Sequence, residues 1–287
     1  MSAPPVTHNF LSLLTGVFAS PVAENPTGAM VEAAYRHHGV AARYVTCDVA
    51  PEDLEMAVRG AVAMGWVGFN CSLPHKVAVM AFLDEIAESA AVIGAVNCVV
   101  VRDARLVGEN TDGKGFLASL RTVIDPRGQV VLVLGAGGAA RAIAVELALA
   151  GAQKIVFANR TPQRGADLAR HVRENTPADT VAVDWVGSLT VSDDVGIVVN
   201  ATSIGLYPHV ADRPDLVYPS LRAGMVVADV IPNPPRSAFL AAAEARNCVT
   251  IDGLGMLVNQ AVIGIKHWTG IDADPQLMRS VLDDLFA

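Results

Sequence analysis

A glycine-rich turn near the middle of the chain constrains the fold more than any other segment. The sequence GAGGAA at 135–140 follows an apolar run at Val130–Leu134 and precedes a helical pattern at 141–150. A strand, a G-x-G-x-x-[GA] turn and a helix in this order predict a βαβ unit that binds a dinucleotide. Glycine lets the backbone approach a pyrophosphate, and the start of the helix supplies free N–H groups and a partial positive charge.

The segment after the next predicted strand indicates which dinucleotide is bound. That strand, at 154–158, is followed by the sequence NRTPQR at 159–164. An NAD site usually has Asp or Glu near this point to hold the ribose 2′-hydroxyl, whereas this chain has Arg160 and Arg164 and no acid. A planar guanidinium pairs with two phosphate oxygens, which favours the 2′-phosphate of NADP. Taken alone, Thr161-Pro162 is also a common helix start and Arg164 an ordinary solvated residue.

Composition limits the possible partners. The 287 residues are enough for two domains, and 52% hydrophobic with 17% charged residues is typical of a globular protein. A net charge of −8 argues against non-specific binding to nucleic acid or to an anionic membrane. An anionic ligand therefore needs a local basic cluster, such as Arg160 with Arg164.

Cysteine and histidine usage predicts neither a metal site nor a disulfide framework. Cys47, Cys71, Cys98 and Cys248 lie far apart without C-x-x-C spacing, which is typical of reduced and mostly buried thiols. The seven histidines also lack metal-ligand spacing. The chain shows no apolar stretch of membrane-spanning length and its first residues lack a basic and apolar signal pattern, so a cytoplasmic location is expected.

The whole chain alternates strands and helices, which predicts two α/β domains. Before the glycine turn, strands are expected at 10–17, 43–49 and 68–72, helices at 27–38, 51–64, from Pro74 and at 112–123, and a hairpin at 96–101 and 105–107. After it, apolar strands at 180–185, 197–200 and 225–230 fit a parallel sheet buried on both faces. We predict a doubly wound, Rossmann-type NADP domain at 114–253. The substrate domain comprises 1–113 and 254–287, whose helices at 256–268 and 275–286 return to it.

Three clusters of small polar residues lie at predicted strand ends of the first domain. They are NCSLPHK at 70–76, GAVN at 94–97 and GENTDGKGF at 108–116. Ligands of open α/β sheets bind at the carboxyl ends of strands. Hydride transfer to a carbonyl also needs a proton donor at the developing alkoxide, and a lysine oriented by a carboxylate can serve.

These clusters, together with the glycine turn, resemble the shikimate dehydrogenase family. The shared segments are N-x-[ST]-x-P-x-K, G-A-V-N, N-T-D-G-x-G-F, G-A-G-G-A-x-R, N-R-T-x-x-R, N-A-T-S-x-G and G-L-G-M-L-V-x-Q, in the family's order over nearly the whole chain. The family reduces 3-dehydroshikimate to shikimate with NADPH, in the chorismate pathway of aromatic amino acid biosynthesis. Some of its members oxidise quinate.

The resemblance implies a role for each matched residue. Lys76 is expected to be the general acid/base, and Asp112 is expected to be its partner and to hold ring hydroxyls of a cyclic polyol. Ser72, Asn97 and Gln260 are expected to hold the remaining hydroxyls. The expected cofactor-binding residues are Gly135, Ala136, Gly137, Gly138 and Ala139 in the turn, Asn159, Arg160, Thr161 and Arg164 at the adenosine phosphate, Ala201 and Thr202 beside the cofactor, and Gly253 at the nicotinamide. The simpler alternatives are a solvated Lys76, an Asn97 bonded only to nearby backbone and a Gln260 that faces solvent.

The chain departs from the family at the position that holds the substrate carboxylate. Two serines in S-x-S-P are replaced by Asn25 and Thr27, a tyrosine by Pro232 and a histidine by Glu24. Asn25 and Thr27 can still donate to a carboxylate, but losing one donor to a charged acceptor costs about 1.5–3 kcal/mol. We therefore expect the reaction type to be retained, with shikimate, quinate or another cyclic polyol as the substrate.

Two other functions fit parts of the pattern. A catalytically idle NADP(H)-binding regulator could use the same scaffold, although it would have no chemical use for both Lys76 and Asp112. Methylenetetrahydrofolate dehydrogenase is also a two-domain protein with a catalytic lysine, but N-T-D-G and N-R-T-x-x-R fit it less well. The protein is expected to be a monomer or a homodimer.

Overall fold

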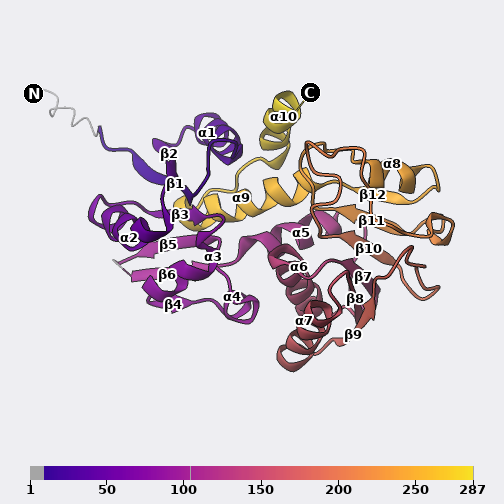
Figure 1. Cartoon of the computed structure of the whole chain (residues 1–287). Coiled ribbons are helices and arrows are strands. Elements are labelled where there is room, and N and C mark those ends of the chain that lie inside the picture. Colours follow the sequence, from indigo (N-terminus) through magenta and orange to yellow (C-terminus); the bar gives the residue numbers. More distant parts are fainter. Residues whose placement is uncertain (1–9, 104, 287) are drawn as a thin grey trace, which may run out of the picture.

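The computed structural model describes residues 10–103 and 105–286, which form two six-stranded sheets covered by helices (Figure 1). Each sheet with its helices forms one lobe, and the C-terminal helices return to the first of them. The predicted fold class, two α/β units of which the second is Rossmann-type, is confirmed. Among the described residues, no helix combines the length and the apolar character needed to cross a membrane.

The first lobe is built on a mixed sheet with the strand order β2-β1-β3-β5-β6-β4. Its strands are β1 (Leu13–Ala19), β2 (Ala42–Asp48), β3 (Gly68–Cys71), β4 (Glu85–Ile86), β5 (Cys98–Arg102) and β6 (Arg105–Glu109). Its helices are α1 (Thr27–His37), α2 (Leu54–Ala63), α3 (His75–Ala78) and α4 (Glu88–Ile93), with 3₁₀ turns at Pro51–Asp53 and Val79–Phe82. The predicted hairpin is confirmed, because β5 pairs antiparallel with β6 and Arg102 lies opposite Arg105.

The second lobe is a parallel sheet with the order β12-β11-β10-β7-β8-β9. Its strands are β7 (Val130–Leu134), β8 (Lys154–Asn159), β9 (Asp179–Asp184), β10 (Ile197–Asn200), β11 (Val226–Asp229) and β12 (Val249–Ile251), and its helices are α6 (Gly138–Leu149), α7 (Pro162–Asn175) and α8 (Ala238–Glu244). This is the doubly wound order, in which successive strands are added outward on one side of β7 and then, from β10 onward, on its other side. The glycine turn follows β7 and therefore lies at the switch point where dinucleotides bind.

Helix α5 (Thr111–Arg121) lies between the lobes and packs against helices on two sides. A Cβ atom at Gly113 would lie 2.3 Å from the carbonyl oxygen of Ala142 on α6, and one at Gly115 would lie 2.6 Å from the backbone nitrogen of Gln260 on α9 (Gly253–Thr269). Both glycines are therefore required for the close approach of the neighbouring helices. The predicted domain boundaries at 113/114 and 253/254 stay a prediction, and the first of them falls within α5.

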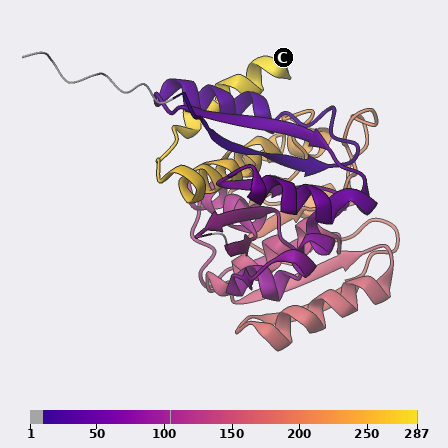
Figure 2. The same cartoon turned by 90° about the vertical axis from the view of Figure 1, so that its left-hand side faces the viewer.

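Helices α9 and α10 (Pro275–Leu285) return to the first sheet, as predicted (Figure 2). The indole N–H of Trp268 donates to the carbonyl oxygen of Val99 on β5 at 3.0 Å. Its ring occupies the space beside Gly68, where a Cβ atom would lie 2.2 Å from the indole. Helix α10 packs against α1, and Arg279 pairs with Asp252 before α9 at 2.7 Å. These contacts connect the end of the chain to its beginning.

Several predicted elements differ at their ends. The first strand begins at Leu13 instead of 10, and the helix expected from Pro74 is the single turn α3, which Pro74 precedes. The helix after the glycine turn begins at Gly138, earlier than the pattern at 141–150 indicates, because the last three residues of the turn, 138–140, are already helical. The sequence analysis did not predict the short elements β4, α4, α8 and β12, and for the longer helix α7 it noted only the possible start at Thr161-Pro162.

Candidate active site

Lys76 and Asp112, 36 residues apart in the chain, form an ion pair with Nζ 2.7 Å from Oδ2. Lys76 lies in the single turn α3 that follows β3, and Asp112 lies in the first turn of α5. Asn110 caps α5, because its Oδ1 accepts from the backbone N–H of Asp112 at 3.2 Å. The two side chains are 28% and 18% exposed, so a ligand can reach them although protein surrounds most of their surface.

Asn97 holds the other oxygen of this carboxylate. Its Nδ2 donates to Asp112 Oδ1 at 2.8 Å and to Thr111 Oγ1 at 3.0 Å, and its Oδ1 accepts from the Thr111 N–H at 2.7 Å. A primary amide has two N–H donors, and protein acceptors occupy both of them. Asn97 therefore orients Asp112, whereas its expected contact with substrate stays a prediction.

Gln260 is buried beside the same cluster and does not face solvent. The residue is 6% exposed. Its Oε1 accepts from Thr111 Oγ1 at 3.4 Å, and its Nε2 donates to the Leu257 carbonyl at 3.0 Å. Ser72 lies at the end of β3, half-buried, and its carbonyl oxygen accepts from the backbone N–H of His75, next to Lys76. Ser72 lies in the segment between β3 and α3, and Gln260 lies on α9, which packs against α5. The substrate contacts of both residues stay predictions.

Asn25 and Thr27 lie at the start of α1. Asn25 Oδ1 accepts from the Thr27 N–H at 3.0 Å, which leaves its Nδ2 as the group that can donate to a ligand. Thr27 is 5% exposed. Tyr44, which the sequence analysis did not select, and Asn70, the first residue of the cluster at 70–76, connect this region with the pair. The backbone N–H of Tyr44 donates to Glu32 Oε1 on α1 at 2.6 Å. Tyr44 donates to Asn70 Oδ1 at 2.7 Å, and Asn70 donates to the carbonyl oxygen of Asn97 at 3.0 Å.

The glycine turn leaves the start of α6 open. Gly135 has φ of +109°, and a Cβ atom there would lie 3.0 Å from the Ala201 carbonyl oxygen, so glycine brings the turn against 201–202. Gly137 and Gly138 are exposed, and a Cβ atom at either would meet nothing within 4 Å. The first turn of α6 has neither an acidic residue nor a side-chain cap. Its N–H groups are therefore available to a pyrophosphate.

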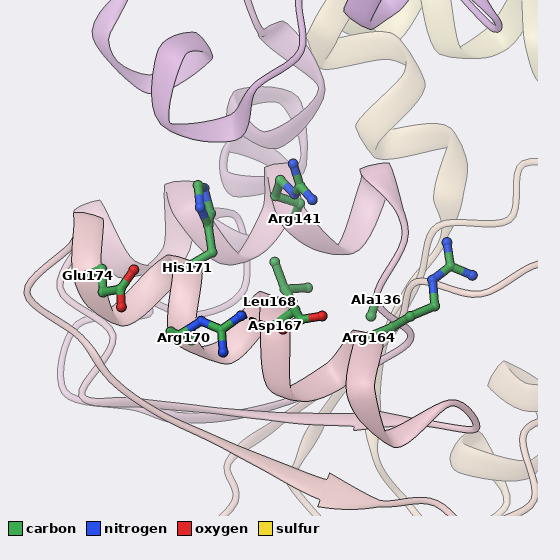
Figure 3. A pocket seen from close by; sticks show the side chains of 8 residues that line it. All are labelled: Ala136, Arg141, Arg164, Asp167, Leu168, Arg170, His171 and Glu174. Atoms are coloured by element: carbon green, nitrogen blue, oxygen red, sulfur yellow. Dashed lines mark hydrogen bonds and ion pairs between the residues drawn. The ribbon is translucent and has the colours of Figure 1, made fainter.

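The arginine segment lies beside this turn, at the start of α7. Thr161 and Pro162 are the N-cap and first residue of α7, the helix start given above as the simpler interpretation of this pair, and Asn159 Nδ2 donates to the Thr161 carbonyl at 2.9 Å. Arg160 and Arg164 are exposed. Arg164 lines a cavity of about 400 Å³ together with Ala136 of the glycine turn (Figure 3). The predicted 2′-phosphate and pyrophosphate residues thus border one region of the surface.

The remaining cofactor candidates surround the ends of β10 and β11. Thr202 Oγ1 donates to Asn200 Oδ1 at 2.6 Å, and a Cβ atom at Gly253 would lie 2.3 Å from the Ile231 carbonyl oxygen. Asp229 organises this loop, although the sequence analysis gave it no role. It is 1% exposed and accepts from Asn200 Nδ2 at 3.0 Å, from the Ile231 N–H at 3.1 Å and from Ser237 Oγ at 2.6 Å. Burial raises the pKa of Asp229 to about 6.

Family models match most of the chain. Residues 17–99 match the shikimate dehydrogenase substrate binding domain, 119–206 match shikimate / quinate 5-dehydrogenase, and 253–282 match the shikimate 5′-dehydrogenase C-terminal domain.

Individual proteins are similar over almost their whole length. The shikimate dehydrogenase (NADP(+)) of Methanopyrus kandleri is 40% identical over 95% of this chain and 96% of its own. The ligand-free 5-ketofructose reductase of Gluconobacter sp. strain CHM43 is 55% identical, with a TM-score of 0.95 over 97% of this chain and 100% of its own. The shikimate 5-dehydrogenase of Thermus thermophilus, solved with NADP(H) and shikimate, is 33% identical, with a TM-score of 0.84 over 95% of this chain and 99% of its own.

Proposed function

The chain belongs to the shikimate dehydrogenase family, and we propose that it interconverts a ketone and a secondary alcohol on a polyhydroxylated substrate with NADP(H). It is an oxidoreductase that acts on CH–OH groups. The observation that carries the proposal is the ion pair of Lys76 and Asp112, which Asn97 orients from the opposite side. A regulator without catalytic activity would have no need for an acid–base pair held from both sides at a ligand-accessible position.

The coenzyme is NADP(H), and the residues of this chain fit it. The open start of α6 suits the pyrophosphate, because free N–H groups and the helix dipole favour an anion there. Arg160 and Arg164 supply the positive charge for a 2′-phosphate, with Asn159 and Thr161 at the same turn. When bound, NADPH supplies the hydride.

Lys76 performs the proton transfer in this proposal. In the direction of reduction, its Nζ gives a proton to the carbonyl oxygen of the substrate as that oxygen becomes negative, so ketone, hydride and proton give the alcohol. In the opposite direction the neutral amine takes the proton back from the hydroxyl. Asp112 fixes the direction of the Lys76 N–H bonds and stabilises the ammonium, because its Oδ2 lies 2.7 Å from Nζ. Asn97 keeps the carboxylate in place.

We infer that the substrate is an uncharged polyhydroxylated ketone such as 5-ketofructose. Lys76 is the only cation among the predicted catalytic and substrate-binding residues, and Asp112 already neutralises it. Asn25 uses its oxygen for the start of α1, and Pro232 has no hydroxyl to donate. An uncharged ligand needs no counter-charge, whereas a desolvated carboxylate does. The 55% identity to a 5-ketofructose reductase over the whole chain supports the same class.

The second candidate pair is 3-dehydroshikimate and shikimate, with quinate as a relative. It is favoured by the 40% identity to a shikimate dehydrogenase and by two donors at the start of α1, Asn25 Nδ2 and the Thr27 hydroxyl. Of the two candidate classes, only the second carries a carboxylate. Comparing kcat/KM for 5-ketofructose, 3-dehydroshikimate, shikimate and quinate with both coenzymes therefore distinguishes them. A larger kcat/KM with shikimate than with the ketose would contradict the uncharged class.

A matched pair of lysine variants tests the reaction itself. Lys114 forms an ion pair with Glu109 at 2.7 Å and is 31% exposed, so it resembles Lys76 in pairing and burial but carries no proposed chemistry. Lys76→Ala is expected to lower kcat at least about a hundredfold with an unchanged Kd for NADPH, whereas Lys114→Ala should change kcat less than about threefold. Equal effects of the two variants on kcat would contradict the role of Lys76.

A further inference from the structure

Two side chains of the second lobe hold the end of a first-lobe helix. The short helix α4 ends at Gly94, which has φ of +69°, and the carbonyl groups of its last turn need donors from outside the helix. Arg141 on α6 donates from Nη1 to the Ile93 carbonyl oxygen at 3.3 Å, and Nε2 of His171 on α7 lies 2.6 Å from the Val92 carbonyl oxygen. Figure 3 shows both side chains pointing away from their helices toward the first-lobe ribbon.

The residues that follow this helix end position the catalytic pair. The Ala95 carbonyl oxygen accepts from Asn110 Nδ2 at 3.0 Å, at the cap of the helix that carries Asp112. The Val96 N–H donates to the carbonyl oxygen of Lys76 itself at 2.8 Å. Asn97 then binds the Asp112 carboxylate. A shift of the end of α4 therefore also moves residues 95–97, which contact both Lys76 and the helix that carries Asp112.

On the other side, the two donors belong to the helices whose first turns border the coenzyme phosphates. Arg141 lies one turn after Gly137, whose carbonyl oxygen accepts from its backbone N–H at 3.0 Å. His171 follows Arg164 by seven residues, so the two lie on the same face of α7, and both line the cavity of about 400 Å³ with Arg141. Each helix thus connects a predicted phosphate contact to a contact with α4 through one or two rigid turns.

From this arrangement we propose that Arg141 and His171 are positioning residues that set the Lys76–Asp112 pair relative to the bound coenzyme. The inference rests on the proposed function for its catalytic consequence, but its structural part depends only on coenzyme binding. Binding of NADPH fixes the positions of the first turns of α6 and α7. Through their bonds to α4, Arg141 and His171 then fix the position of residues 92–97. Arg141 is the last residue of the G-A-G-G-A-x-R segment. The proposed function gives a ligand to the turn residues of this segment but no role to Arg141.

Amide hydrogen exchange tests the structural part without a substrate. The amides of Val96 and Asn97 report on the segment, because they bond to the carbonyl oxygens of Lys76 and Glu109. NADPH is expected to slow their exchange in the parent protein, and this slowing should be absent in Arg141→Ala and His171→Ala. Arg170→Ala is the matched control, since Arg170 lines the same cavity but pairs with Asp167 of its own helix, and it should behave as the parent.

Kinetics test the catalytic part. Arg141→Ala and His171→Ala should lower kcat by about tenfold to a hundredfold and increase the kinetic isotope effect of C4-deuterated NADPH, because the pair is misplaced for the chemical step. Their Kd for NADPH should stay within about twofold of the parent. Arg141→Lys and His171→Gln retain a donor and should recover most of the kcat.

Three results would overturn the proposal. The first is equal protection of Val96 and Asn97 by NADPH in the parent and both alanine variants. The second is a selective loss of NADPH over NADH binding in Arg141→Ala, which would make Arg141 a phosphate ligand instead. The third is an unchanged kcat together with lower stability, which would make the contact only structural. A parent protein that binds NADPH but turns over no substrate would contradict the proposed function, while the exchange measurement would still decide the structural part.

Discussion

Asp229 is a buried carboxylate whose hydrogen-bonding partners are all neutral donors. It lies at the end of β11 and accepts from Asn200, from the backbone of Ile231 and from Ser237. These bonds lower its pKa, but the loss of hydration on burial is the larger effect and raises the pKa from 3.8 to about 6. Asp229 therefore changes its charge within a pH range in which the folded protein can be studied.

The size of the effect of Asp229 on the free energy of unfolding follows from the rise in its pKa, and the sign of the effect follows from the direction of that shift. Because the folded state holds the proton more tightly than the unfolded state, ionisation of Asp229 destabilises the fold, and the destabilisation grows as the pH rises from about 4 to about 6. A rise from 3.8 to about 6 corresponds to about 3 kcal/mol, fully present above the folded-state pKa. About 2 kcal/mol of it develops between about pH 4.5 and about pH 7.5.

Asp229→Asn removes the titration and keeps most of the geometry. The amide oxygen can still accept from Asn200 and Ile231, and any altered contact with Ser237 adds an offset that does not depend on pH. The free energy of unfolding in urea, followed by tryptophan fluorescence, should therefore rise in the variant relative to the parent by about 2 kcal/mol from about pH 4.5 to about pH 7.5. Ser237→Ala removes a bond that lowers the pKa, so it should move the transition to higher pH. A variant-to-parent difference that stays constant with pH would refute the reasoning.

Four further variants test coenzyme choice, helix packing and substrate class. The double variant Arg160→Ala/Arg164→Ala should raise the Kd of NADP⁺ at least roughly tenfold more than that of NAD⁺ in calorimetric titrations, and equal losses would contradict the 2′-phosphate assignment. Gly115→Ala should lower the free energy of unfolding by about 1–3 kcal/mol, because its Cβ would lie 2.6 Å from a backbone nitrogen of α9. Gly60→Ala should raise it by about 0.5–1 kcal/mol, since nothing lies within 4 Å there, and equal effects would contradict the packing argument. Pro232→Tyr should lower the KM for shikimate roughly tenfold by adding a donor and leave that for 5-ketofructose unchanged, whereas an unchanged shikimate KM would exclude a role for this position.

The central strands of the second lobe could be predicted from the sequence because their signals are local, whereas its short elements α8 and β12 were missed. Val130–Leu134 and Ile197–Asn200 are apolar runs bounded by polar or glycine residues, and both strands have the predicted ends. Thr161 and Pro162 begin α7 as their residue types predict, although the Thr161 side chain makes no capping hydrogen bond. Burial on both faces of a parallel sheet leaves continuous apolar runs, which are easier to recognise than alternating patterns.

The two missed elements of the first lobe, β4 and α4, are short and depend on their neighbours. Strand β4 is only Glu85–Ile86, and it exists because it pairs with β6. Helix α4 begins without a side-chain cap and contains six residues, too few for a helical periodicity to show. Gly94 at its end was the one available signal, since glycine often follows the last residue of a helix.

The sequence predicted which segments form the candidate site, but it could not show which hydrogen bonds their side chains make. Lys76 and Asp112 are in contact, as the clusters predict, while their roles remain proposals. Asn97 looked like a substrate ligand, yet its N–H groups are bound to Asp112 and Thr111. Arg141 contacts Ile93, 48 residues earlier, and nothing local in the sequence indicates a bond across two lobes.

The segment N-T-D-G-x-G-F illustrates how one motif combines chemistry with packing. Its polar residues contact the site: Asn110 caps α5, Thr111 bonds to Asn97, and Asp112 pairs with Lys76. Its glycines have a different purpose, because Gly113 and Gly115 lie about 200° apart around the helix and admit α6 on one side and α9 on the other. The carboxylate is thus placed by contacts with both lobes. A chain that kept Asp112 but replaced Gly113 would push α6 away and displace the carboxylate from Lys76, so the motif indicates this chemistry only when its glycines are present.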